Sequence, residues 1–408
     1  MCLVAKRKKI ALMLSVSMAI SNFSYADSGQ IVPDGRTVTT IVETGTRTDV
    51  TTATISGDSA FNSFSKFDVY SGNTANLYLP DGTSNLINVI RDERTDIDGI
   101  LNSFKNGRIG GNVYFLNPHG VVVGSGGVVN VGALSVATPT TEFLDDIIDA
   151  GGNINSSVLD AVLAGNIPLD PAGLICVSGT VNAMDSIDLA AGSIDVSGKL
   201  LAAKALVPGF DYDVPVNVAD LTASGVVVKG GRVFIVALND VNFNVPAPGS
   251  VSPSIEAADI VIGSAFGRIG RADNPLRVRL IGDEGTLAAW ADGLVNVAAV
   301  SGDLRVKLAV SITDDVMLDA LDGSLYVETV ITGNDVRLAA AKNIIGTGSG
   351  VNVTGNSACL IARDGRIDVD TSLDTVTLDS VKGIALYETD GLRVVSAKNT
   401  GTGDVGIL

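Results

Sequence analysis

The sequence predicts an all-β protein, a right-handed parallel β-helix with about 20 residues per coil and a short helical insertion. The first observation is a repeat in the second half of the chain, where strand-like segments return at intervals of 18 to 22 residues. The second is composition, because 46 glycines with only 11 Phe, 7 Tyr and 1 Trp favour thin layers of small and branched side chains. A β-propeller repeat is about twice as long, so a stacked coil fits better.

Five copies of the repeat share apolar residues at alternate positions, a small residue at the fifth position, and Gly or Asn at the eighth. They occupy residues 295–302, 316–323, 336–343, 358–365 and 376–383. Earlier and looser copies are expected at 187–194 and 232–239. Alternation that ends in a Gly or Asn corner predicts strands that stack on one another along a rod.

The first 26 residues are interpreted as a signal peptide. The basic stretch Lys6–Lys9 precedes an apolar segment, Ile10–Phe23, which is short for a membrane span. Small residues before Asp27 place the cleavage between Ala26 and Asp27. A membrane anchor is the alternative, but no other apolar segment reaches 18 residues, so no stable membrane insertion is expected.

Charge and cysteine content narrow the class of protein. The chain has 28 basic and 45 acidic residues, a net charge of −17, which becomes −21 without the four basic residues of the signal peptide. Such acidity argues against binding to nucleic acid or anionic lipid.

Cys176 and Cys359 lie far apart and form no disulfide framework, which fits either a chain that crosses a second membrane unfolded or a core that needs no cross-links.

The most informative stretch runs from Asn102 to Gly132. Two apolar runs, 112–116 and 121–123, flank the tetrapeptide Asn117, Pro118, His119 and Gly120. Pro suits the second position of a type I turn, Gly suits the fourth, and Asn hydrogen-bonds its own backbone from the first. The stretch therefore predicts strand, tight turn and strand, with a further strand at 128–131.

The flanking segments complete the predicted domains. Residues 27–56 alternate as short strands that cap the rod, and Phe61, Phe64 and Phe67 are expected in the core. The charged residues between 91 and 98 are interpreted as a solvated loop. Residues 142–174 break the β-pattern with two helical faces, the first stopped near Gly151 and the second at Gly165, and β-helix repeats occupy 175–408.

Candidate catalytic and metal-binding residues are few. His119 is the only histidine, so no histidine-based metal cluster or catalytic dyad is available, and no cofactor is expected. Acidic residues occur close together at 145–146, 314–315 and 211–213, but acid–base catalysis needs carboxylates that converge in a cleft. The arginines at 268, 271, 277 and 279 are expected to decorate a turn. The chain is therefore expected not to be an enzyme.

Several separated motifs resemble the N-terminal secretion domain of two-partner-secretion exoproteins, the filamentous haemagglutinin type. They are FNSF at 61–64, LPDGTSNLIN at 79–88, IDGIL at 97–101, GNVYFLNPHGVVVGSGGVVNVG at 111–132 and LSVATPT at 134–140. The resemblance covers residues 30–141, within a predicted secretion domain at 27–141. The family's Asn-Pro-Asn-Gly turn has His119 at its third position here. A second family motif, Asn-Pro-Asn-Leu, has Leu79, Pro80, Asp81 and Gly82 as its nearest counterpart.

The resemblance implies a secreted or cell-surface protein. It implies export through the periplasm and across the outer membrane by a dedicated two-partner transporter, whose periplasmic transport-associated domains bind the unfolded chain at the turn 117–120. It also implies an adhesin or haemagglutinin role toward a host-cell surface ligand that the sequence does not identify. Alternatives are a β-helical enzyme acting on polysaccharides and an autotransporter passenger. Because the repeats end in mid-pattern, we expect a fragment of a longer rod.

Overall fold

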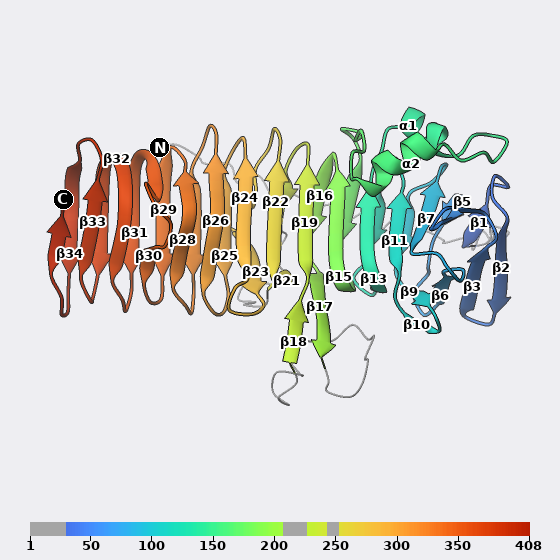
Figure 1. Ribbon diagram of the computed structural model, residues 1–408, viewed down its shortest axis with the longest axis horizontal. Coiled ribbons are helices and arrows are strands. Elements are labelled where there is room, and N and C mark those ends of the chain that lie inside the picture. Colours follow the sequence, from blue (N-terminus) through green and yellow to red (C-terminus); the bar gives the residue numbers. More distant parts are fainter. Residues whose placement is uncertain (1–29, 207–226, 243–252) are drawn as a thin grey trace, which may run out of the picture.

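The computed structural model describes residues 30–206, 227–242 and 253–408, and these form a rod of stacked β-coils (Figure 1). The predicted signal peptide and its cleavage point at Ala26 and Asp27, as well as the acidic residues at 211–213, lie outside the described residues. Among the described strands, successive coils pair in parallel, and antiparallel pairing is confined to the N-terminal cap and two hairpins. The predicted parallel β-helix is confirmed.

The N-terminal cap consists of four short strands, β1 (Ile31–Pro33), β2 (Thr39–Thr44), β3 (Arg47–Thr52) and β4 (Ile55–Ser56). Strands β2 and β3 form an antiparallel hairpin. Strands β1 and β4 pair antiparallel with β5 (Ser59–Phe67), the first strand of the coils. A solenoid needs such an atypical end to cover its first layer, as the sequence predicts for this region.

Three ladders of parallel strands then run along the rod. The first contains β5, β7 (Asn85–Ile90), β11 (Asn112–Leu116), the second halves of β13 (Val128–Ala137) and β15 (Thr180–Ala191), β19 (Arg232–Ala237), β22 (Asp259–Ser264) and β24 (Thr286–Ala291). The second contains β3, β6 (Thr74–Tyr78), β9 (Ile100–Lys105), the first halves of β13 and β15, β17 (Lys199–Leu206), β21 (Ile255–Ala257), β23 (Leu276–Leu280), β25 (Val295–Ala299), β27 (Val316–Ala320) and β29 (Asp335–Ala340). The third contains β8 (Thr95–Ile97), β12 (Val121–Val123), β14 (Leu174–Val177), β16 (Ser193–Val196) and β20 (Val241–Asn242).

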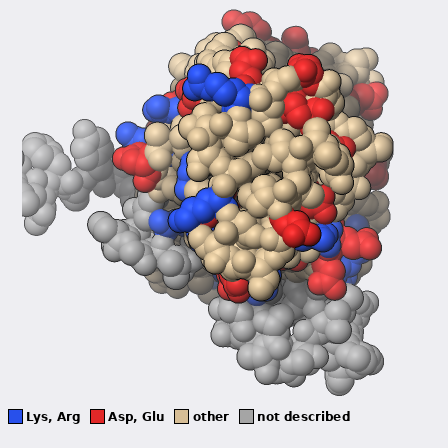
Figure 2. Space-filling model, turned by 90° about the vertical axis from the view of Figure 1, so that its left-hand side faces the viewer, with Lys and Arg blue, Asp and Glu red and all other residues tan. Residues whose placement is uncertain are grey.

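Toward the C-terminal end, longer strands bend to join more than one ladder. The longer strands are β26 (Leu304–Ser311), β28 (Leu325–Thr332), β31 (Val353–Ala362) and β32 (Ile367–Ser380), and the shorter strands between and after them are β30 (Ile344–Gly346), β33 (Ile384–Glu388), β34 (Arg393–Asn399) and β35 (Val405–Ile407). Two further strands, β10 (Arg108–Ile109) and β18 (Val227–Gly230), form the hairpins with β9 and β17. Figure 2 views this end of the rod, where charged side chains gather at the rim and the last strands expose Val394, Val395, Val405 and Leu408.

The register of the second ladder follows the repeat seen in the sequence. Val295 lies opposite Val316, Val316 opposite Val336, Val336 opposite Ala358, and Ala358 opposite Val376. All five side chains are buried in one continuous core that consists mainly of Val, Ile, Leu and Ala. Each copy therefore stacks on the equivalent residues of the next.

The two looser copies at 187–194 and 232–239 stack on each other in a different ladder from the five regular copies. Ile187 pairs with Val233 in the first ladder, on a different side of the coil. Every side of a β-helix shows the same alternation between buried and solvent-facing residues. Periodicity alone therefore does not tell one side of the coil from another.

Helices α1 (Thr141–Ile147) and α2 (Ser156–Leu163) lie over the outer face of the first ladder near its N-terminal end (Figure 1). Thr140 and Asn155 cap them, since their side-chain oxygens accept the N–H groups of Phe143 and Ser157. Gly165, with φ of 73°, ends α2 as the sequence predicts, whereas α1 ends at Ile147, before Gly151.

The helices close a second apolar cluster on the outside of the coil. Helix residues pack there on outward-facing side chains of the first ladder: Phe61, Ile87, Val89, Leu116 and Ala137 meet Leu144, Ile147, Ile148, Leu159 and Val162. Among the residues of known placement, no helix is both long enough and apolar enough to cross a bilayer.

Candidate functional site

The segment 117–120 joins β11 to β12 as a tight turn at a corner of the coil. The N–H of Gly120 donates to the carbonyl oxygen of Asn117 at 3.2 Å. The side-chain Oδ1 of Asn117 accepts the N–H of His119 at 2.9 Å. These are the two bonds predicted for a type I turn that begins with Asn, so the predicted turn is confirmed. Pro118 is buried and His119 is exposed.

Asn117 also binds the preceding coil. Its side chain is 0% exposed, and its Nδ2 donates to the carbonyl oxygen of Glu93 at 2.9 Å and to Oγ1 of Thr95 at 3.0 Å. The side chain therefore satisfies its two donors and its acceptor within the folded chain. In the folded protein Asn117 fixes the register between two coils and presents nothing to solvent.

Gly120 is required by its backbone conformation and by its neighbour. Its φ of 99° lies in the region that other residues rarely adopt. A Cβ added there would lie 2.5 Å from the carbonyl oxygen of Leu174, on the following coil. The carbonyl oxygen of Gly120 in turn accepts the N–H of Thr95 from the preceding coil. The turn is thus held between two neighbouring coils.

An ionic junction lies beside this turn, with Arg91 and Asp34 largely buried and Asp145 exposed; we call it the Arg91 junction. Arg91, whose side chain is 7% exposed, donates from Nε to Asp34 at 3.2 Å and from Nη1 to Asp145 at 2.6 Å. Its Nη2 donates to the carbonyl oxygen of Ile148 at 2.9 Å, and Arg36 donates to the same two acceptors of the α1 region, Asp145 and Ile148. The junction therefore ties the N-terminal cap and the end of α1 to β7.

Two physical effects act on this junction. Burial is the largest effect and lowers the pKa of Arg91. Repulsion from Arg36 lowers this pKa further, while attraction to Asp34 and Asp145 raises it. Guanidinium groups stay charged at any physiological pH, so the junction keeps its positive charges. His119 adds a link to the turn, because its Nε2 lies 2.8 Å from the carbonyl oxygen of Arg91 and donates to it.

The predicted solvated loop at 91–98 is correct at Asp92, Glu93, Arg94 and Asp98, which are exposed, but wrong at 95–97 and at the side chain of Arg91. Residues 95–97 form β8, Arg91 is buried, and the N–H of Asp96 donates to the buried Asp68 at 2.9 Å. Burial raises the pKa of Asp68 despite the nearby Lys66. Arg91 is the exception in this stretch, because its charge is buried and paired with Asp34, whereas the sequence pattern takes charge as a sign of exposure.

The second predicted motif, residues 79–82, forms a simple turn. Leu79 is buried against Gly111, and Oγ1 of Thr83 donates to the carbonyl oxygen of Pro80 at 2.7 Å. Asp81 and Gly82 are exposed. This turn exposes its tip and has no buried Asn, so its geometry differs from that of the turn 117–120.

A chain of asparagines on the second ladder was not found from the sequence. Nδ2 of each donates to Oδ1 of the one before, from Asn182 to Asn130 at 3.0 Å, from Asn130 to Asn102 at 2.9 Å, and from Asn102 to Asn76 at 3.1 Å. Nδ2 of Asn76 then donates to Asp49 in the cap at 2.9 Å. The amides repeat at the strand spacing, so each side chain reinforces the register of the coils.

The predicted acidic pairs have structural partners. Asp145 belongs to the Arg91 junction, while Asp314 and Asp315 accept the backbone N–H groups of Asp315 and Asp335. Of the four arginines expected at a turn, Arg268 pairs with Asp240 at 3.3 Å and Arg279 with Glu256 at 3.4 Å. Within the described ranges, no three His, Cys, Asp or Glu side chains come together as a metal site.

Comparison with known protein families decides the family of this chain. The family model of the TPS secretion domain, the domain of two-partner secretion, matches residues 29–252, more than half of the chain. The chain belongs to this family. The match begins at the cap and continues beyond residue 141, through both helices and the β17–β18 hairpin. It contains the turn 117–120 and the Arg91 junction.

Two solved secretion domains are similar to this TPS protein. The HMW1 secretion domain from Haemophilus influenzae has 13% identity over 92% of this chain and 98% of that chain, with a TM-score of 0.42. The filamentous hemagglutinin secretion domain has 15% identity over 84% of this chain and 99% of that chain, with a TM-score of 0.36. No curated protein matches the chain.

Family membership makes this a secreted two-partner-secretion exoprotein, with an outer-membrane transporter as its partner. The family resemblance drawn from the motifs is therefore confirmed. The sequence did not indicate the Arg91 junction, because its members are separated by up to 112 residues in the chain. The one signal that was available is the run of charges around Arg91 inside an otherwise apolar domain.

Proposed function

We propose that the two-partner transporter recognises residues 60–141 of the TPS protein while the chain is still unfolded, with the turn 117–120 as part of the signal. The observation that supports this order is the complete burial of Asn117. A side chain whose donors and acceptor are all used inside the fold is available to another protein only before folding. The periplasmic transport-associated domains of the transporter are the proposed receptor.

We further propose that the same segment starts folding outside the cell. The Arg91 junction joins the cap, β7 and α1, so the first stable unit contains residues up to Ile148. Later coils then add on the preformed ladders, each pairing only with its neighbour. Folding of each coil outside the membrane keeps the chain from sliding back.

Replacement of Asn117 by Ala is expected to stop secretion without reducing synthesis. The change removes side-chain bonds to Glu93, Thr95 and His119, and with them the proposed signal. The measurement is the extracellular yield of a tagged chain in a Gram-negative host that carries the matched transporter. A normal yield of Asn117→Ala would contradict a role of Asn117 in export.

A matched control separates recognition from folding. Asn343 also binds neighbouring coils from a corner, since its Oδ1 accepts the N–H of Arg366 at 3.0 Å, but it lies far from the proposed signal. We expect Asn343→Ala to be secreted normally. Binding of each urea-unfolded chain to the transporter's purified periplasmic domains completes the test. Equal binding of wild type and Asn117→Ala would show that the residue acts in folding alone.

The proposed role of the exported rod is adhesion. A long rod with a polar, acidic surface extends a binding surface away from the cell, and the family contains haemagglutinins. We expect the purified protein to bind cultured epithelial cells in a saturable manner, with unlabelled protein competing. The absence of saturable binding to epithelial cells and to erythrocytes would contradict the adhesive role.

A further inference from the structure

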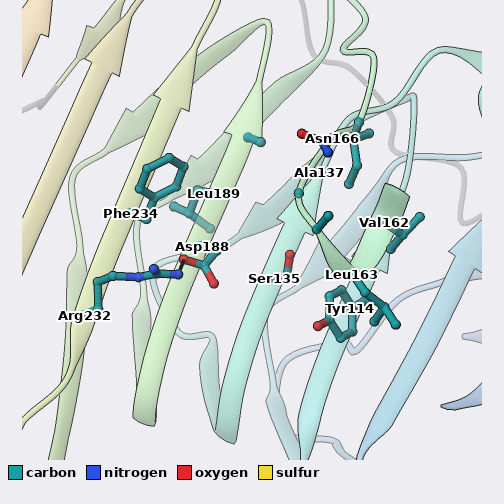
Figure 3. Close-up of a pocket in the computed structure, with 14 residues that line it drawn as sticks. Tyr114, Ser135, Ala137, Val162, Leu163, Asn166, Asp188, Leu189, Arg232 and Phe234 are labelled. Atoms are coloured by element: carbon teal, nitrogen blue, oxygen red, sulfur yellow. Dashed lines mark hydrogen bonds and ion pairs between the residues drawn. The ribbon is translucent and has the colours of Figure 1, made fainter. Parts of the chain in front are cut away.

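A pocket opens on the outer face of the first ladder, where the helical cover ends. It has a volume of about 400 Å³ and lies between α2 and β19 (Figure 3). One row of directly paired positions crosses it, from Tyr114 on β11 through Ser135 and Asp188 to Phe234 on β19. Neighbouring strands lie about 4.8 Å apart, so the two aromatic residues stand about 14 Å from each other at opposite ends.

The pocket combines apolar walls with polar groups. Nη2 of Arg232 donates to Asp188 at 2.8 Å, and its guanidinium lies 5.6 Å from the centre of the Phe234 ring. Among the described residues, the Tyr114 hydroxyl, the Ser135 hydroxyl and the Asn166 side-chain amide have no hydrogen-bond partner, and all three line the pocket. Donors and acceptors without protein partners beside aromatic rings are typical of a binding site of this size.

The charges of the pocket favour a neutral ligand. Arg232 is neutralised by Asp188, and the chain as a whole carries a net charge of −17, so a free anion would be repelled. Burial is the largest effect and raises the pKa of Tyr114, and the negative charge of Asp188 raises it further. The phenol therefore stays protonated and can donate a hydrogen bond. A purely apolar ligand would leave the two hydroxyls and the amide without compensating bonds.

We propose that this pocket binds a neutral saccharide. The apolar face of a sugar ring fits against Tyr114 or Phe234, and its hydroxyls pair with the carboxylate of Asp188, the hydroxyl of Ser135 and the amide of Asn166. The carboxylate accepts hydrogen bonds from sugar hydroxyls, and the amide both accepts and donates them. An apolar wall does neither. The site does not include the turn 117–120, although Tyr114 and Ser135 lie within the segment proposed to be recognised before folding.

The experiment uses the folded, purified chain and saturation-transfer NMR with separate neutral sugars: glucose, galactose, N-acetylglucosamine and lactose. Sialyllactose and a sulfated heparin disaccharide are the charged comparisons. We expect saturation of the ring protons of at least one neutral sugar and weak or no signal from the charged ones. No signal from any neutral sugar at millimolar concentration, or a signal only from the charged sugars, would overturn the proposal.

Three variants locate the binding. Phe234→Ala removes one wall, and we expect the dissociation constant to rise about fivefold or more, the usual effect of losing one ring contact. Ser135→Phe fills the middle of the pocket and should abolish binding. Tyr326→Ala is the control, because Tyr326 also carries an arginine on its ring, Arg305 at 4.7 Å, but lies outside the pocket. Equal binding by all three variants would overturn the proposed site, provided that each melts as the wild type does.

Discussion

Replacement of Gly120 by Val lowers the free energy of unfolding by about 3 kcal/mol or more, from a strained positive φ and a backbone overlap. The physical reasons are the φ of 99° and the carbonyl oxygen of Leu174, which would lie 2.5 Å from the new Cβ. Neither coil can move without breaking its ladder bonds. The first measurement is urea unfolding of the purified, refolded variant. The second is the extracellular yield, which we expect to fall at least tenfold, the ratio that corresponds to a free-energy difference of about 1.4 kcal/mol.

The control is Gly302→Val. Gly302 has a similar φ of 74°, but nothing lies within 4 Å of an added Cβ. This variant carries backbone strain without overlap, so we expect it to lose only about 1 to 2 kcal/mol. If both variants lose the same stability, close packing of the turn 117–120 against Leu174 is not what makes Gly120 necessary.

Replacement of Arg91 by Leu is expected to lower the free energy of unfolding by about 3 kcal/mol, the typical result of removing one partner of a buried ion pair. The variant leaves Asp34, 11% exposed, with Arg36 as its remaining cationic partner and the Ser63 hydroxyl as a donor, and it removes a donor to the carbonyl oxygen of Ile148. The cap and α1 then lose their common attachment to β7. We expect hydrogen exchange to rise first in β1 and α1, which mass spectrometry of peptides can follow.

Arg94 provides the matched comparison on the same stretch. It pairs with Asp96, but both side chains are largely exposed, at 52% and 36%. An exposed pair contributes about 0 to 1 kcal/mol, so Arg94→Leu should unfold close to the wild type. A loss of stability from Arg94→Leu as large as that from Arg91→Leu would show that burial of the junction is unimportant.

The features that could be predicted from the sequence are those set by neighbouring residues. The type I turn at 117–120 follows from Asn, Pro and Gly at fixed positions, and Gly165 ends α2 because it adopts a positive φ. The direct pairing of Val295 with Val316 follows from a repeat that places equal residues about 20 positions apart. One local signal was overlooked, since Asn106 and Gly107, with φ of 53° and 77°, form the tight turn between β9 and β10.

The features that could not be predicted depend on contacts between distant residues. Arg91 is buried because Asp34 and Asp145 approach it from the cap and from α1, 57 and 54 residues away. The asparagine chain exists only because Asn182 and Asn130, 52 residues apart, meet in the same register. Similarly, the pocket depends on where α2 stops covering the first ladder. The turn was therefore accessible from the sequence, but its attachment to the rest of the domain was not.

The parallel ladders also determine how the rod responds to mechanical force. Each coil bonds only to the coils on either side of it, so tension on the last coil is carried by that coil alone until it detaches. One coil occupies about 4.8 Å of the rod but about 70 Å as a straightened chain. Under a pull from its C-terminal end, the rod would yield one coil at a time and lengthen about fourteenfold over the unwound part. It would act as a shock absorber whose N-terminal end, held by the Arg91 junction, unwinds last.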